Sequence, residues 1–102
     1  MGNVRLSARQ SEALAQALDS AHLPLGSKVY LFGSRTDMNA AGGDVDLLVS
    51  APRADRYDVA KRIRREYHRI IGERIDIIVV DPEHPDPAQE AFLRTVTKVP
   101  VR

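Results

Sequence analysis

Apolar positions recur with helical spacing near the start of the chain. The stripe consists of Ala13, Leu14, Ala17 and Leu18. Residues three or four positions apart share one face of a helix, so this spacing is typical of an amphipathic helix. Ser7 and Gln10 have the spacing of a capping box, in which two side chains satisfy the first backbone groups. The pattern predicts a helix that begins near Ser7 and ends before Pro24.

Three short apolar runs predict β-strands at residues 28–32, 46–49 and 74–80. The first is β-branched and aromatic, and Pro52 ends the second. The third is apolar almost throughout after its start, a pattern typical of a strand that is covered on both faces.

Between the second and third runs, residues 54–71 return to helical spacing. The expected buried stripe is Tyr57, Ala60, Ile63, Tyr67 and Ile70, and Gly72 is the expected C-cap. The opposite face carries Lys61, Arg62, Arg64, Arg65 and Arg69. We expect this basic face to be solvated, since the total charge is balanced. A nucleic-acid patch and a docking face for an acidic partner are the alternatives.

The C-terminal part begins with a Pro-rich loop over residues 81–87. Asp86 is the expected N-cap of a last helix over residues 88–97, with Pro87 in its first turn. The final residues stay apolar and β-branched, which fits either an edge strand or a segment that orders against a partner. The order of elements predicts a layered α/β fold, with one small sheet and helices packed on it, in a single domain over residues 1–102.

Composition narrows the possible functions. The chain has 15 basic and 14 acidic residues, a net charge of +1 and no cysteine. Nucleic acid and membrane surfaces are therefore not favoured as direct partners, and thiolate metal sites are excluded. His22, His68 and His84 have no spacing that links them as metal ligands. With no signal peptide or apolar span expected, the predicted location is the cytoplasm.

Two aspartates stand where the second strand begins. Asp44 and Asp46 are two residues apart, so on a strand both side chains point the same way. Two carboxylates this close repel each other unless a cation lies between them, and oxygen ligands of this kind suit Mg²⁺. Asp76, in the third strand, joins them if the two strands are neighbours. Three carboxylates around hard cations are typical of two-metal phosphoryl or nucleotidyl transfer.

The first strand runs into Gly33, Ser34 and Arg35. Glycine allows close backbone approach, the serine hydroxyl and backbone N–H groups can hold phosphate oxygens, and the arginine adds positive charge. Each motif alone has a simpler explanation. Gly-Ser after a strand is usually a turn, Asp-x-Asp is usually a solvated loop or cap, and Asp76 fits an exposed position on an edge strand. The combination in this order favours a nucleotide site.

The combination resembles the nucleotidyltransferase fold of the DNA polymerase β superfamily. It is most similar to the minimal nucleotidyltransferase domains that act as antitoxins of HEPN-domain toxins. The matching stretches are residues 31–35, 44–49 and 75–77. The resemblance implies a small mixed sheet, two Mg²⁺ ions bound by Asp44, Asp46 and Asp76, and a triphosphate held by Gly33, Ser34 and Arg35.

By the same resemblance, the domain transfers AMP from ATP to a tyrosine hydroxyl of a partner HEPN toxin, with which it forms a hetero-oligomer. Two alternatives stay open. The domain neutralises its toxin by occupancy alone, or it modifies a small molecule such as an antibiotic. The second is weakened because larger relatives add an acceptor domain that this sequence lacks.

Overall fold

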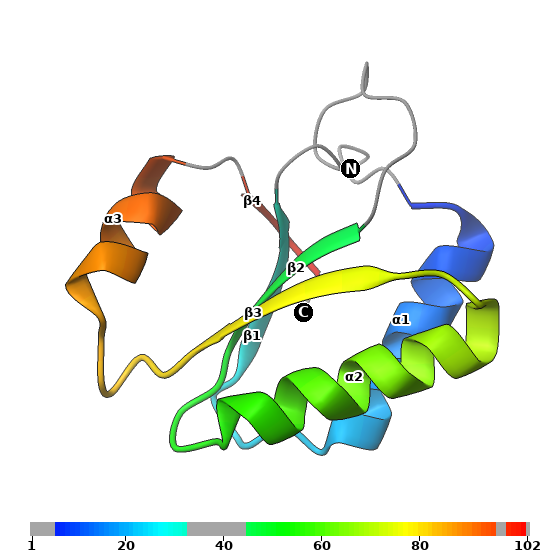
Figure 1. The fold of residues 1–102 in the computed structure, drawn as a ribbon, viewed down its shortest axis with the longest axis horizontal. Helices are drawn as coiled ribbons and strands as arrows, with labels where there is room; N and C mark the ends of the chain where they lie inside the picture. Colours follow the sequence, from blue (N-terminus) through cyan, green and yellow to red (C-terminus); the bar gives the residue numbers. More distant parts are fainter. Residues whose placement is uncertain (1–5, 33–44, 96–97, 102) are drawn as a thin grey trace.

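A computed structural model describes residues 6–32, 45–95 and 98–101 of the chain (Figure 1). The helices are α1 (Ala8–Ala21), α2 (Arg56–Ile71) and α3 (Pro87–Thr95). The strands are β1 (Lys28–Phe32), β2 (Val45–Ser50), β3 (Ile75–Val80) and β4 (Lys98–Pro100). The predicted α/β order is confirmed, with β4 added at the end.

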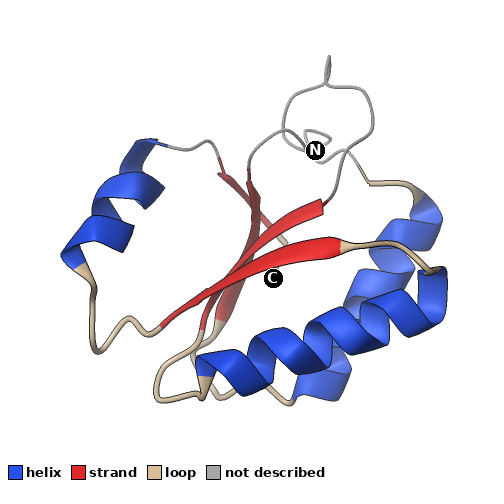
Figure 2. Cartoon of the chain, viewed as in Figure 1, coloured by secondary structure: helices blue, strands red, loops and turns tan. Residues whose placement is uncertain are grey.

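The four strands form one sheet in the order β3-β2-β1-β4 (Figure 2). β1 pairs antiparallel with both β2 and β4, whereas β2 and β3 are parallel. Parallel neighbours need a crossover connection, and here α2 supplies it. The sheet is therefore mixed, as the resemblance implied.

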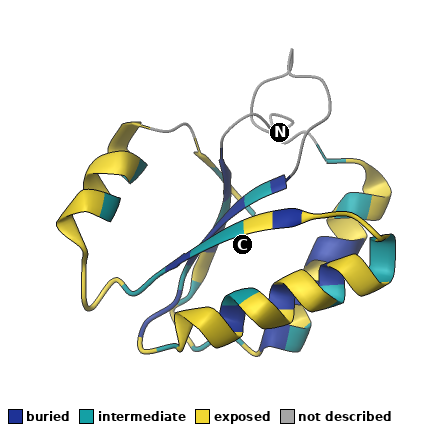
Figure 3. Cartoon of the chain, viewed as in Figure 1, coloured by how far each residue is buried: buried dark blue, intermediate teal, exposed yellow. Residues whose placement is uncertain are grey.

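The core lies between one face of the sheet and the pair of helices α1 and α2, which lie together on that face (Figures 1 and 3). The sheet contributes inward residues at alternate positions, and α1 contributes the predicted stripe. The largest fully buried side chains are Tyr67, Leu14, Leu18, Leu31, Leu47, Ile63, Val29, Val45 and Val49. This burial fixes the orientation of β2, and so decides which of its residues face away from the helices.

The helix ends follow the chemistry of their sequences. Ser7 and Gln10 form the expected capping box at α1. Asp55, which the sequence analysis did not identify, caps α2 by accepting from the N–H groups of Tyr57 and Asp58. Gly72 ends α2 in the left-handed region, at φ 73°.

The predicted buried stripe of α2 is wrong at its first position. Tyr57 is 80% exposed, and Val59 is buried in its place. The buried positions are Val59, Ile63 and Tyr67, spaced by four. Since helical spacing allows neighbouring stripes, only packing against α1 and the sheet selects between them.

The expectation that the third strand is covered on both faces is also wrong. In β3, Ile75 and Val79 on one face are buried, whereas Asp76 on the other face is exposed. β3 also stands at the edge of the described sheet. For the last residues, the edge-strand alternative is confirmed, because β4 pairs with β1. None of the helices in the described part of the chain has the length and hydrophobicity needed to span a bilayer.

α3 lies apart from α1 and α2 and has no buried residue (Figures 1 and 3). Its N-cap is Asp86, which accepts from the N–H groups of Ala88 and Gln89, as expected. The ring of Phe92 packs edge-on against Phe32 of β1, with ring centroids 6.3 Å apart.

Candidate functional site

Two of the three predicted carboxylates lie side by side. In the parallel pairing of β2 and β3, Asp46 and Asp76 are direct register partners. Side chains of partnered residues point to the same face of a sheet. The two strands are therefore neighbours, and the condition under which Asp76 joins the Asp46 cluster is met.

The aspartate pair lies on the sheet face opposite α1 and α2. Asp46 stands between Val45 and Leu47, both of which are buried in the core beneath the helices, so its side chain projects the other way. The same row continues into β1, where Phe32 is the register partner of Asp46. The carboxylates thus lie at the end of the sheet where β1 finishes and where β2 and β3 begin.

The other predicted site residues, Gly33, Ser34, Arg35 and Asp44, lie outside the described residues. Chain connectivity still limits the site. Gly33 follows Phe32 directly, and Asp44 precedes Val45 directly. In the sequence, Ser34 and Arg35 follow Gly33 directly.

The donor chemistry of the pair fits a hard divalent cation. Two carboxylates on adjacent strands, one half-buried and one exposed, offer oxygen ligands and leave room for water and phosphate oxygens in the coordination shell. Within the ranges that the structure describes, no group of three or more Asp, Glu, His or Cys side chains is arranged to hold a metal. The predicted third ligand, Asp44, is outside those ranges, so the two-ion site stays a prediction.

The simpler explanation of Asp76 is that it is a solvent-exposed residue on an edge strand. The structure agrees with this, since Asp76 is exposed and β3 lies at the edge of the described sheet. That explanation does not require an acidic partner at the matching position of the next strand. A like-charged pair in register is destabilising unless something compensates for it. The register of Asp46 with Asp76 is therefore the observation that favours a functional site.

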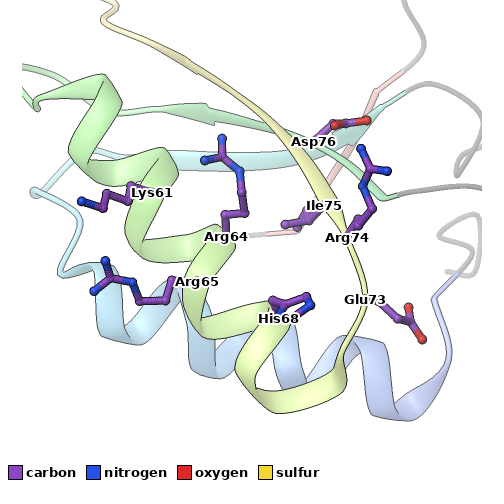
Figure 4. A pocket seen from close by; sticks show the side chains of 8 residues that line it. All are labelled: Lys61, Arg64, Arg65, His68, Glu73, Arg74, Ile75 and Asp76. Atoms are coloured by element: carbon purple, nitrogen blue, oxygen red, sulfur yellow. The ribbon is translucent and has the colours of Figure 1, made fainter.

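Sequence reasoning missed a pocket of about 380 Å³ between α2 and the start of β3. Asp76 lines it together with basic residues of α2 and with Arg74 (Figure 4). The basic stripe of α2 was visible in the sequence. Its meeting with Arg74 and Asp76 depends on how α2 packs against β3, which the sequence does not specify.

Two of the α2 arginines that the sequence analysis grouped together are paired within their own helix. The Nε atom of Arg62 lies 2.9 Å from Oδ2 of Asp58, and Nε of Arg69 donates a hydrogen bond to the carboxylate of Glu66. The hydrogen bond from Arg69 holds the pKa of Glu66 below its ordinary value, and the same contact raises the pKa of Arg69. These exposed pairs match the prediction of a solvated face, but only for this part of the helix.

Comparison with known proteins gives one family. A search of curated proteins finds no significant match. The profile of the nucleotidyltransferase domain matches residues 11–97, from α1 through α3. This span contains all six predicted site residues, and the mixed sheet with its register-paired aspartates is consistent with it. The chain belongs to the nucleotidyltransferase domain family.

Proposed function

We propose that this nucleotidyltransferase domain transfers AMP from ATP to a hydroxyl group of a protein acceptor, and that the acceptor is a tyrosine of a partner HEPN toxin. The observation that carries the proposal is the register pairing of Asp46 with Asp76 in a chain of this family. The transfer chemistry rests on the family. The toxin as acceptor rests on the resemblance of the sequence to antitoxin-type minimal nucleotidyltransferases.

The reaction is a displacement at phosphorus. The acceptor oxygen forms a bond to the α-phosphorus of ATP, the bond to the bridging oxygen breaks, and pyrophosphate leaves. Asp76 is exposed and lies on the outer strand of the pair, so an acceptor can approach it from solvent. We assign to Asp76 the role of receiving the proton from the acceptor hydroxyl.

Asp46 has the complementary position. It lies one strand further in, beside the end of β1, after which Gly33 and Ser34 follow in the sequence. In this arrangement Asp46 orients the nucleotide, whose triphosphate we assign to Gly33, Ser34 and Arg35. Asp44, Asp46 and Asp76 would hold Mg²⁺, which supplies charge neutralisation for the phosphoryl oxygens when bound.

The test uses the protein encoded next to this gene as the acceptor. Incubation with ATP and Mg²⁺ should add the mass of one or more AMP groups to that neighbour. The Asp76→Asn variant should abolish the added mass while the complex still forms on a sizing column, because the substitution is nearly isosteric and removes the charge of a single exposed side chain.

Neutralisation by occupancy gives a different result. If Asp76→Asn protects cells from the toxin as well as the wild type does, and no AMP is found on the neighbour with either protein, catalysis is not the antitoxin mechanism. If AMP is transferred to a small molecule and no mass is added to the neighbouring protein, the acceptor is a small molecule and the proposed protein acceptor is wrong.

A further inference from the structure

The pocket beside Asp76 is strongly basic. Its charged and polar lining includes Lys61, Arg64, Arg65, His68, Arg74 and Asp76 (Figure 4). Four of these are permanent cations. The lining also contains a second acidic residue, Glu73. Its carboxylate accepts a hydrogen bond of 2.8 Å from the side chain of Gln10 in α1, which does not line the pocket.

The α2 part of the basic lining lies on one face because of helical geometry. The α2 residues that line the pocket fall at i, i+3, i+4 and i+7, which is one face of a helix. Arg74 immediately precedes β3 and is two positions from Asp76, so both lie on the same side of the chain. Figure 4 shows Arg64 reaching from α2 toward the strand from which Arg74 and Asp76 project.

These cations are not held by neighbouring carboxylates. Within the described ranges, Lys61, Arg64, Arg65 and Arg74 have no acidic partner within 4.0 Å, whereas Arg62 and Arg69 on the same helix do. Like charges gathered in one pocket repel each other. A group of unpaired cations around a hollow is the arrangement expected of a surface that binds an anion.

The proposed function assigns the triphosphate to Gly33 and Ser34, which follow β1 in the sequence, whereas the pocket borders β3. The strand order places β1, which leads into Gly33 and Ser34, on one side of β2, and β3 on the other. A displacement at phosphorus needs the attacking oxygen and the leaving group on opposite sides of the reacting atom. The pocket is therefore on the side from which the acceptor approaches.

We infer that the α2–β3 pocket binds an acidic segment of the protein acceptor, next to the hydroxyl that receives the nucleotidyl group. This inference rests on the proposed function for the role of the acceptor, but the binding it describes is independent of catalysis. Carboxylates of the acceptor pair with the pocket cations, and the adjacent hydroxyl is thereby held at Asp76.

Two observations favour a protein segment over nucleic acid. Among the described residues that line the pocket there is no Phe, Tyr or Trp, whereas single-stranded nucleic acid is usually bound by stacking on such side chains. The basic area is also short, because the adjoining surface of α2 carries Asp58 and Glu66, and a phosphate backbone needs an extended basic track. A few carboxylates match the size and charge of this pocket.

The first experiment measures binding without ATP. The probe is a short fluorescent peptide with a central tyrosine flanked by glutamates, and its comparison peptide has glutamines in their place. The wild-type protein should bind the acidic peptide more tightly. Arg64→Gln/Arg65→Gln should weaken that binding roughly threefold to tenfold, the range expected for losing two exposed ion pairs, and salt should weaken it further.

The matched control removes the same number of charges from the same helix. Arg62→Gln/Arg69→Gln changes the two arginines that are paired with Asp58 and Glu66, and it should bind the peptide like the wild type. Equal losses in both double variants, or equal binding of the two peptides, would refute the pocket and leave only general charge attraction.

Two competitors test other anions. If a short RNA of mixed sequence binds the pocket more tightly than the acidic peptide and displaces it, the occupant is nucleic acid and the inference is wrong. If Arg64→Gln/Arg65→Gln loses affinity for ATP with Mg²⁺, the pocket belongs to the triphosphate and the inference is again wrong. We expect ATP binding to be unchanged in this variant.

A second experiment separates this inference from the proposed function. With ATP and Mg²⁺, the acidic peptide should gain AMP faster than the glutamine peptide, and the Arg64→Gln/Arg65→Gln variant should remove that preference. Transfer without a preference refutes the pocket and keeps the enzyme. Selective binding without any transfer to the peptide or the neighbouring protein keeps the pocket and refutes the proposed transfer.

Discussion

Asp46 and Asp76 should destabilise the fold by their mutual repulsion, and the same two carboxylates are suitable ligands for a divalent cation. Two carboxylates in register repel each other when both are ionised. A divalent cation bound between them in the folded chain would remove this repulsion and stabilise the fold by mass action. The pair should therefore make the stability of the protein depend on metal.

We expect Mg²⁺ or Mn²⁺ with ATP to raise Tm. At a ligand concentration of about 100 times Kd, the stabilisation is about 2.7 kcal/mol, which corresponds to roughly 10 °C or more for a domain of this size. The measurement is a thermal melt by circular dichroism. Asp46→Asn/Asp76→Asn should show little of this shift. An equal shift in the variant would mean that the metal binds elsewhere.

Substitutions at Gly33 and Ser34 test whether these residues bind the triphosphate of ATP. Gly33→Val should weaken ATP binding more than Ser34→Ala does, because a β-branched side chain blocks backbone approach whereas the serine change removes a single hydroxyl. Isothermal titration calorimetry with ATP and Mg²⁺ measures both. Unchanged affinity in Gly33→Val would make Gly33 a turn residue only.

Asp81 gives a pH-dependent contribution to stability. It accepts a hydrogen bond of 2.9 Å from the N–H of Glu83. That bond, followed by contacts with His84 and Arg53, holds the pKa of Asp81 below its ordinary value. Because the folded-state pKa is lowered, the stabilisation is complete above the ordinary pKa and disappears as pH falls through the folded-state value.

Asp81→Asn should therefore be less stable than the wild type at neutral pH, and the difference should shrink as the pH falls below about 4. Paired thermal melts of the two proteins across this range measure the effect. A difference in Tm that does not change with pH would assign the role of Asp81 to packing rather than charge.

At the level of elements, α2 is the connection that brings β2 and β3 into register. Its start is set by Asp55, whose carboxylate accepts from the N–H groups of Tyr57 and Asp58 at 3.0 and 3.1 Å. A side-chain cap of this kind contributes about 1 kcal/mol.

Asp55→Ala should therefore lower Tm by roughly 4–8 °C, whereas Asp55→Ser should restore most of the loss because serine also accepts at this position. The measurement is thermal unfolding of the two variants beside the wild type. Equal Tm values for Asp55→Ala and the wild type would show that packing alone fixes the start of α2.

The positions of the elements were largely predictable from the sequence, because caps and apolar runs are local signals. β1 has the predicted bounds, and the Ser7 capping box and the Gly72 cap are confirmed. What depends on packing was not predictable. The buried stripe of α2 includes Val59 and not Tyr57, and β3 has an apolar sequence although it stands at an edge.

For the site, the sequence supplied the residue types but not their arrangement. It identified Asp46 and Asp76 as candidates, and it predicted that they lie together only if their two strands are neighbours in the sheet. Their direct register depends on the path of α2 between the two strands. Predicting the basic pocket needed the same tertiary information, since Arg74 and the α2 cations line one pocket only after α2 packs beside β3.

At the level of the whole molecule, α3 is the element least integrated into the fold. It has no buried residue, and Phe92, which contacts Phe32, is itself 46% exposed. An edge-to-face aromatic pair contributes about 0.5–1.5 kcal/mol beyond its buried area. The opening of α3 should therefore be cheap compared with global unfolding.

Phe92→Ala should increase hydrogen exchange of backbone amides in α3 by roughly fivefold, which corresponds to the loss of about 1 kcal/mol of aromatic contact. Amides of α2 should exchange as in the wild type. The measurement is hydrogen–deuterium exchange by mass spectrometry. Parallel changes in α2 would show that α3 is part of the same cooperative unit as the core.

The edge position of β3 has a consequence for the behaviour of the protein at high concentration. In the sheet formed by the described residues, β3 has a neighbour on one side only, so it offers backbone groups to another chain, and it is apolar apart from Asp76. Charges on such a strand discourage intermolecular β-pairing. The Asp76 carboxylate therefore contributes to colloidal stability whatever its part in transfer, and Asp76→Val should make the protein more prone to aggregate at high concentration.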